Sequence, residues 1–182
     1  MKQITNPPAD IMAVHAEPNG AFPNNPALPV LIYRGALRDT SPGAVQRLLQ
    51  ENGWTGSWRD GVYSFHHFHS NAHEVLACCA GSARVCFGGP DGPVVEVNAG
   101  DVVIQPAGTG HKNEGSSDDL LVVGAYPEGQ ADYDLMRGDP GEMEAAAALI
   151  AGVALPSADP IYGPGGPLAE HWKDAGVGER TG

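Results

Sequence analysis

Three histidines and a glutamate, divided between two separated segments, most strongly constrain how this chain can fold. Five of its seven histidines lie between residues 66 and 111. His67, His69 and Glu74 share one short stretch, and His111 follows much later in the chain. Three imidazoles and one carboxylate are a typical ligand set for a borderline divalent metal ion. These four groups can meet only if the two segments lie side by side, so the sequence predicts a closed β-sheet.

Local strand geometry supports this prediction. Residues 62–69 are rich in aromatic and other β-forming types, which predicts a strand. Side chains alternate between the two faces of a strand, so His67 and His69 are expected on one face. A turn at 70–72 and a second strand from Glu74 would then return the carboxylate to the histidine pair. Gly81 fits the hairpin turn that follows.

These residues resemble the two sequence motifs of the cupin family. Only the end of the second motif departs from the family pattern: the family has an asparagine where this chain has Gly115, and Asn113 lies out of register. Further stretches resemble the YjlB-like cupins, a bacterial branch of unassigned activity. Those stretches are 58–76, 106–112, 124–130 and 159–172. The matching motif positions are Gly61, His67, His69, Glu74 and Gly81, followed by Gly100, Pro106, Gly108 and His111.

The resemblance implies an all-β fold, the double-stranded β-helix or jelly-roll barrel. We expect an N-terminal arm with one strand and a short helix over residues 1–60, and the cupin barrel core over 61–127. A C-terminal helix and an irregular tail that covers the barrel are expected over 128–182. Ser41-Pro42 predicts the start of the first helix, and Asp139-Pro140 predicts the start of a helix that ends at Ala151. The barrel strands are expected at 62–69, 74–79, 82–88, 94–98, 101–105 and 119–126.

Charge and hydropathy narrow the classes of partner. The net charge is −12 with only 10 lysines and arginines, and no basic run is present. We therefore expect no binding to nucleic acid or to an anionic membrane surface. No apolar stretch approaches the roughly 20 residues that span a bilayer, and the N-terminus lacks the apolar core of a signal peptide. These features predict a cytoplasmic bacterial protein, and the family resemblance implies a homodimer.

Other chemistries find little support in the sequence. His73-Glu74 is not followed by a second histidine at helical spacing, since residue 77 is Ala, so a zinc-protease helix is rejected. The glycines at 163–166 lack the lysine and hydroxyl residue of a phosphate-binding loop, and no nucleophile elbow is present. Cys78, Cys79 and Cys86 are interpreted as small buried hydrophobic residues that stay reduced.

Several residues near the ligands have two interpretations. Tyr63, Phe65 and Gln105 are candidates for the lining of a substrate pocket, although inward aromatic residues usually belong to a core. Arg59 could hold a carboxylate at the pocket mouth or form an ordinary surface ion pair. His73 is a candidate for a role behind the metal ligands, or on the surface.

The sequence therefore predicts one divalent metal ion bound by His67, His69, Glu74 and His111. Iron, manganese, zinc, nickel and cobalt all suit these ligands. One hypothesis is a metal-dependent enzyme, a dioxygenase or an isomerase, that acts on a small polar or anionic molecule. The alternative is a non-catalytic module that binds or senses a small ligand in the cupin pocket. A barrel that keeps these residues without holding metal is the plainest interpretation of the same pattern.

Overall fold

Short runs of β-branched and other apolar residues form most of the strands, because such side chains pack well on a pleated surface. The protein is described by a computed structural model that covers residues 3–173. Its elements in chain order are β1 (Ile11–Val14), β2 (Val30–Tyr33), α1 (Pro42–Glu51), β3 (Trp54–Asp60), β4 (Glu74–Ala80), β5 (Ser82–Phe87), β6 (Val94–Asn98), β7 (Val102–Gln105), β8 (His111–Ser116), β9 (Leu121–Pro127), the 3-10 turn η1 (Pro140–Glu142), α2 (Met143–Ala151) and α3 (Pro167–His171).

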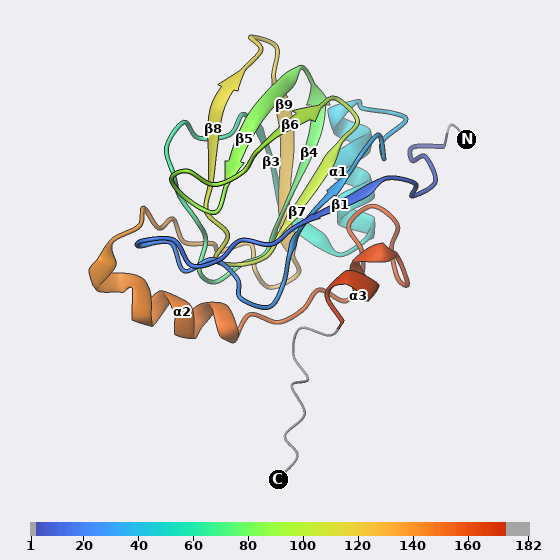
Figure 1. The fold of residues 1–182 in the computed structure, drawn as a ribbon. Coiled ribbons are helices and arrows are strands. Elements are labelled where there is room, and N and C mark those ends of the chain that lie inside the picture. The colour runs from blue at the N-terminus through green and yellow to red at the C-terminus, as the bar shows by residue number, and fades with distance from the viewer. Residues whose placement is uncertain (1–2, 174–182) are drawn as a thin grey trace.

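The strands form two antiparallel sheets. One sheet has six strands in the order β1-β2-β7-β4-β9-β3, and the other has three in the order β6-β5-β8. Apart from β1 and β2, neighbouring strands in the larger sheet are not consecutive in the chain, and β5, β6 and β8 belong to the other sheet (Figure 1). This arrangement confirms the predicted all-β jelly-roll barrel with peripheral helices.

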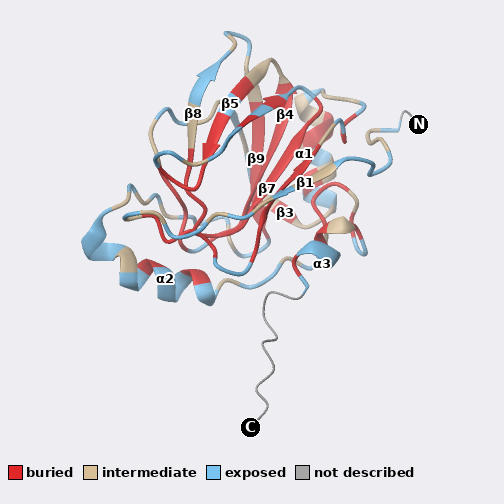
Figure 2. Ribbon diagram, viewed as in Figure 1, coloured by how far each residue is buried: buried red, intermediate tan, exposed pale blue. Residues whose placement is uncertain are grey.

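Strand alternation divides the core into two layers. Val30, Ile32, Leu76 and Val103 project from the large sheet and meet residues of β5 and β6, such as Val85, between the sheets. The intervening residues of the same strands project to the other face. Because both faces of the central strands are covered, β4, β7 and β9 are buried along almost their whole length (Figure 2).

The outer face of the large sheet is covered by α1 and by the C-terminal segment. Val45 and Leu49 of α1 join Leu31 and Val75 of the sheet in one buried cluster. Leu168 and Trp172 from the tail complete this cluster. The α2 helix lies instead at one end of the barrel, with most of its surface exposed (Figure 2).

Most predicted elements are confirmed within a few residues. The strands expected at 74–79, 82–88, 94–98, 101–105 and 119–126 correspond to β4, β5, β6, β7 and β9. The expected helices correspond to α1 and to η1 with α2. Gly81 forms the predicted turn with a φ of +71°, where an added Cβ would lie 2.4 Å from the Ser117 hydroxyl.

The strand predicted at 62–69 is wrong. Residues 61–73 form a loop with two isolated bridges, His67 to His111 and Phe68 to Met136. The composition favours a strand, but consecutive residues find partners in two different segments, so no continuous ladder forms. β1, β3 and β8 were not predicted; β3 and β8 are short of apolar residues and largely exposed.

The predicted tail is irregular except for the short helix α3, and residues 174–182 of it lie outside the described part of the chain. The division at residues 60 and 127 stays a prediction. Within residues 3–173, no helix has both the length and the apolar character needed to cross a membrane.

A buried carboxylate fastens the tail to the centre of the fold. Asp159 accepts a 2.6 Å hydrogen bond from the Tyr33 hydroxyl on β2. It also accepts backbone N–H bonds from Ile161, Tyr162 and Leu168 at 2.8, 2.9 and 3.1 Å. The side chain of Asp159 therefore organises its own loop and joins it to a strand 126 residues earlier in the chain.

We predict that Asp159→Ala lowers the free energy of unfolding by more than about 3 kcal/mol, since each buried donor left without an acceptor costs about 1 to 3 kcal/mol. Tyr33→Phe, which removes one bond to the carboxylate, should cost about 1.5 to 3 kcal/mol. Urea unfolding followed by circular dichroism measures both. The matched control is Tyr162→Phe, which removes only a bond to the Asn6 carbonyl; an equal loss in Tyr33→Phe and this control would contradict the assignment.

Candidate metal centre

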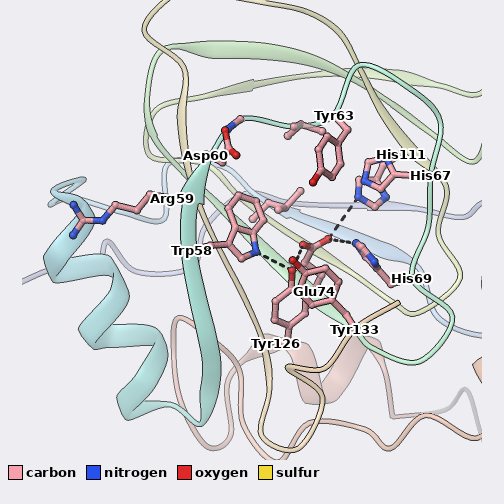
Figure 3. A pocket seen from close by; sticks show the side chains of 13 residues that line it. Trp58, Arg59, Asp60, Tyr63, His67, His69, Glu74, His111, Tyr126 and Tyr133 are labelled. Atoms are coloured by element: carbon pink, nitrogen blue, oxygen red, sulfur yellow. Dashed lines mark hydrogen bonds and ion pairs between the residues drawn. The ribbon is translucent and has the colours of Figure 1, made fainter. Parts of the chain in front are cut away.

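Four potential ligands converge at one end of the space between the two sheets (Figure 3). Glu74 is the first residue of β4 and shares the inner face of that strand with Leu76. His111 is the first residue of β8. His67 and His69 come from the loop 61–73, which is held against His111 by reciprocal backbone bonds of 3.2 and 2.9 Å between residues 67 and 111.

The structure brings the four residues together as the sequence analysis expected. One ring nitrogen from each of His67, His69 and His111 lies within 4.8 Å of the other two, and all three residues are buried. The Oε2 atom of Glu74 lies 3.3 Å from His69 Nε2 and 3.6 Å from His111 Nε2. His67 and His69 point toward the same site, as strand geometry predicted, although the segment that carries them is a loop.

Each of the three imidazoles is oriented by a backbone carbonyl. His67 Nδ1 donates to the Phe65 carbonyl at 3.0 Å, and His111 Nδ1 donates to the Thr109 carbonyl at 3.0 Å. His69 Nδ1 donates to the carbonyl of Asp134. A carbonyl oxygen can only accept, so these bonds place the proton on Nδ1 in the neutral rings and leave each Nε2 with a lone pair. Such bonds orient metal-binding histidines in general.

The Glu74 carboxylate is held at both oxygens. Gln105 donates from Nε2 to Oε2 at 2.6 Å, and Tyr126 donates its hydroxyl hydrogen to Oε1 at 3.0 Å. Trp58 Nε1 donates in turn to the Tyr126 hydroxyl at 2.8 Å. The carboxylate therefore cannot rotate without breaking this chain of bonds.

The buried groups shift one another's ionisation. Burial opposes the charged form of Glu74, but His69 and His111 outweigh it and lower its pKa to about 2. Burial also opposes the charged form of His69, whereas the Glu74 carboxylate raises the pKa of this ring overall. Burial lowers the pKa of His67, and it lowers that of His111 to about 3. The site thus holds one carboxylate and two firmly neutral imidazoles near neutral pH.

A segment after β9 supports the ligand loop from outside. Asp134 accepts hydrogen bonds from the backbone N–H and the hydroxyl of Ser70, in addition to its carbonyl bond with His69. Phe68 and Met136 exchange backbone bonds of 3.0 and 2.9 Å. The guanidinium of Arg137 lies 3.6 Å from the centre of the Phe65 ring. Residues 128–138 therefore act as a strap that fixes the loop carrying His67 and His69.

The candidate pocket residues occupy different places. Tyr63 lines a cavity beside the ligands, and Phe65 stacks on it with ring centres 4.8 Å apart. The Gln105 amide nitrogen contacts both Glu74 Oε2 and His111 Nε2, at 2.6 and 3.0 Å, and its Oε1 has no hydrogen-bond partner among the described residues. Arg59 borders the cavity, but its guanidinium donates to Gln46 on α1 and points away from the ligands (Figure 3).

His73 faces away from the ligands. Its Nδ1 accepts the backbone N–H of Ala107 at 2.9 Å, and its ring lies 5.0 Å from that of Trp172. The ring therefore packs into the far side of β4, where burial lowers its pKa to about 4.

Sequence reasoning missed Trp58, Tyr126 and Tyr133, which line the cavity from β3, β9 and the strap. One signal was available for Trp58. The indole lies across Gly124 of β9, where an added Cβ would come within 2.1 Å of the ring. A glycine in a buried strand often marks a close approach of this kind.

The donor set fits a divalent metal ion of the first transition row. Three imidazole Nε2 atoms and one ionised carboxylate oxygen converge, and two of these four atoms, Glu74 Oε2 and His111 Nε2, also lie 2.6 and 3.0 Å from the Gln105 amide nitrogen. The residues that would hold the ion are His67, His69, Glu74 and His111.

Comparison with known proteins gives one relative along most of the chain. "Uncharacterized protein YjlB" of Bacillus subtilis (strain 168) is 44% identical over 154 residues, which cover 85% of this chain and 92% of the relative. No protein-family model matches the chain.

Solved structures give only partial matches. Acireductone dioxygenase from Bacillus anthracis, with a cadmium ion in its active centre, is 15% identical over 48% of this chain and 60% of its own, with a TM-score of 0.36. A structure of oxalate decarboxylase is 28% identical over 44% of this chain and 22% of its own, with a TM-score of 0.34. Each match spans less than two thirds of the solved chain. At such TM-scores neither protein indicates what this chain binds.

The low pKa of His73 predicts a specific pH dependence of stability. A histidine whose pKa is about 4 when folded and about 6.5 when unfolded binds fewer protons in the folded state between these values. The folded state therefore loses stability as pH falls from 6.5 to 4, by about 3 kcal/mol for this residue. We expect the difference in unfolding free energy between wild type and His73→Gln to shrink by about that amount over this range, as measured by urea unfolding. A constant difference would contradict the prediction.

Proposed function

The chain belongs to the family of YjlB from Bacillus subtilis, and on this premise we propose that it is a cupin that binds one divalent metal ion through His67, His69, Glu74 and His111. The observation that carries the proposal is the orientation of the three imidazoles. Their Nδ1 atoms all bond to backbone carbonyls, so their Nε2 atoms face one another beside an ionised carboxylate.

We further propose that the protein is an enzyme that acts on a small polar or anionic molecule, with oxygenase-type or isomerase-type chemistry. A cavity of about 260 Å³ opens beside the four ligands, and Trp58, Tyr63 and Tyr133 form part of its wall. The volume lies just below the roughly 300 to 1,000 Å³ of sites for drug-sized ligands, so the molecule it accepts is small. A bound ion would supply Lewis-acid chemistry or, if redox-active, oxygen chemistry.

The chain's own residues would fix the ion and set the charge of the site. Glu74 contributes negative charge and is kept in place by Gln105 and Tyr126. One carboxylate opposite a divalent ion leaves a net charge of about +1, which favours a donor atom with a lone pair or a negative charge. Metal identity, the expected homodimer and the cytoplasmic location stay predictions.

Metal content is the direct test of this proposal. We expect wild-type protein to hold close to one equivalent of a transition metal, and His111→Ala to hold less than about a tenth of that amount, because loss of one imidazole opens the ligand set. Inductively coupled plasma mass spectrometry on freshly purified protein measures both. The matched control is His66→Gln, which changes the neighbour of His67 on the same loop. Equal metal in wild type and His111→Ala would refute the site.

Glu74→Gln distinguishes an enzyme from a binding module. If turnover of a substrate is found, the variant should reduce it by about 100-fold or more, as is typical when a charged group at the reacting centre is lost. A non-catalytic binding module is favoured if Glu74→Gln still binds the ligand and wild-type protein shows no detectable turnover. Steady-state assays and calorimetry on the same preparations separate these outcomes.

A further inference from the structure

The wall of the cavity beside the candidate metal centre carries exposed aromatic rings. Tyr63 is 55% exposed and Tyr133 is 42% exposed, which is unusual for large rings that border a buried site. Exposed apolar surface next to a cavity is typical of a ligand-binding region. The Tyr63 hydroxyl points into the cavity, opposite the histidines (Figure 3).

Each exposed ring is fixed by a second ring behind it. Tyr63 stacks on Phe65 with centres 4.8 Å apart, and Tyr133 stacks on Tyr126 with centres 4.4 Å apart. The Tyr133 ring also contacts His69 edge-on at 5.0 Å. Rings held in this way present flat, rigid surfaces, so a ligand loses little binding energy in ordering them.

Trp58 adds a third aromatic surface. Its indole is seated on Gly124, and its only donor, Nε1, is already bonded to the Tyr126 hydroxyl. A ligand therefore meets the apolar part of this side chain rather than its polar edge.

Two of the three charged residues other than histidine that line the cavity are acidic. Besides the histidines, the charged lining residues are Arg59, Asp60 and Glu74. The Arg59 guanidinium is bonded to Gln46 and turned away from the cavity. Asp60 lies exposed at the rim, where one of its oxygens accepts the Gly61 N–H at 2.7 Å. With a divalent ion bound, Glu74 and Asp60 together bring the net charge of the lining close to zero, while the exposed Arg137 lies outside the lining, over the Phe65 ring.

We propose that this cavity accepts an uncharged, polyhydroxylated molecule of the size of a monosaccharide or a short polyol, rather than a phosphorylated or multiply carboxylated one. Such molecules have an apolar C–H face, which would pack on Tyr63, Tyr133 and Trp58. Their hydroxyl groups can bond to the Tyr63 hydroxyl and to the Asp60 oxygen that does not accept the Gly61 N–H. The inference rests on the proposed function, because hydroxyl or carbonyl oxygens of the same molecule would reach the metal ion.

Isothermal titration calorimetry on the metal-loaded full-length protein tests the proposal. The probes are D-glucose, D-fructose and D-mannitol, compared with D-glucose 6-phosphate and malonate. We expect at least one uncharged probe to bind about 10-fold or more tightly than both charged probes. Tyr63→Ala should weaken that binding by about 5-fold or more, which matches the contribution of one aromatic contact. Leu149→Ala, which changes a comparably exposed residue on α2, should leave it unchanged.

Tighter binding of the phosphate or the dicarboxylate would overturn the proposal, as would a metal-loaded protein that binds none of the uncharged probes. Equal affinity in Tyr63→Ala and Leu149→Ala would also overturn it. Metal content is measured on the same samples, so the two proposals fail separately. If the protein holds no metal but still binds an uncharged probe through Tyr63, the aromatic wall is supported and the metal proposal is refuted.

Discussion

The structure depends on holding three imidazoles and a carboxylate together in a buried space. Removing such groups from water is costly unless their hydrogen bonds are replaced. Here the replacement is systematic: the Nδ1 atoms of the three rings bond to backbone carbonyls, and both Glu74 oxygens accept bonds from neutral side chains. The ligands are therefore ordered by the protein itself, which reduces the entropy that an ion would otherwise have to offset on binding.

This ordering draws on three regions of the chain. β4 and β8 are rigid because they belong to sheets, but the loop 61–73 has only two isolated bridges. The strap 128–138 compensates through Asp134 and Met136, and it also brings Tyr133 to the cavity. The same segment thus supports the ligands and contributes to the binding wall. A change in the strap would affect both.

Features that depend on residues close together in the sequence could be predicted from the sequence, whereas features that depend on contacts between distant residues could not. His67, His69, Glu74 and His111 were found because their spacing follows a known pattern, and the buried strands because their apolar runs are local signals. β3 and β8 escaped because exposed, polar strands have no such signal. The roles of the strap and of Tyr126 were not predicted for another reason: they depend on contacts between residues more than fifty positions apart in the sequence. Examples are Ser70 with Asp134 and Glu74 with Tyr126. For Arg59 a local signal was misleading. Strand alternation predicted its side chain near the pocket mouth, but its bond to Gln46 turns the guanidinium away from the cavity.

The hydrogen bond between Asp159 and Tyr33 has a consequence for synthesis on the ribosome, because it joins the tail to an early strand. β2 lies beside β7 inside the large sheet, yet the Tyr33 hydroxyl donates to Asp159, and the Pro29 carbonyl accepts a bond from Trp172. Packing around β2 therefore stays incomplete until residues 159–172 have left the exit tunnel. Folding with such distant contacts is slow compared with local helix formation. Until residues 159–172 arrive, the nascent chain must keep its apolar strands from associating with other chains.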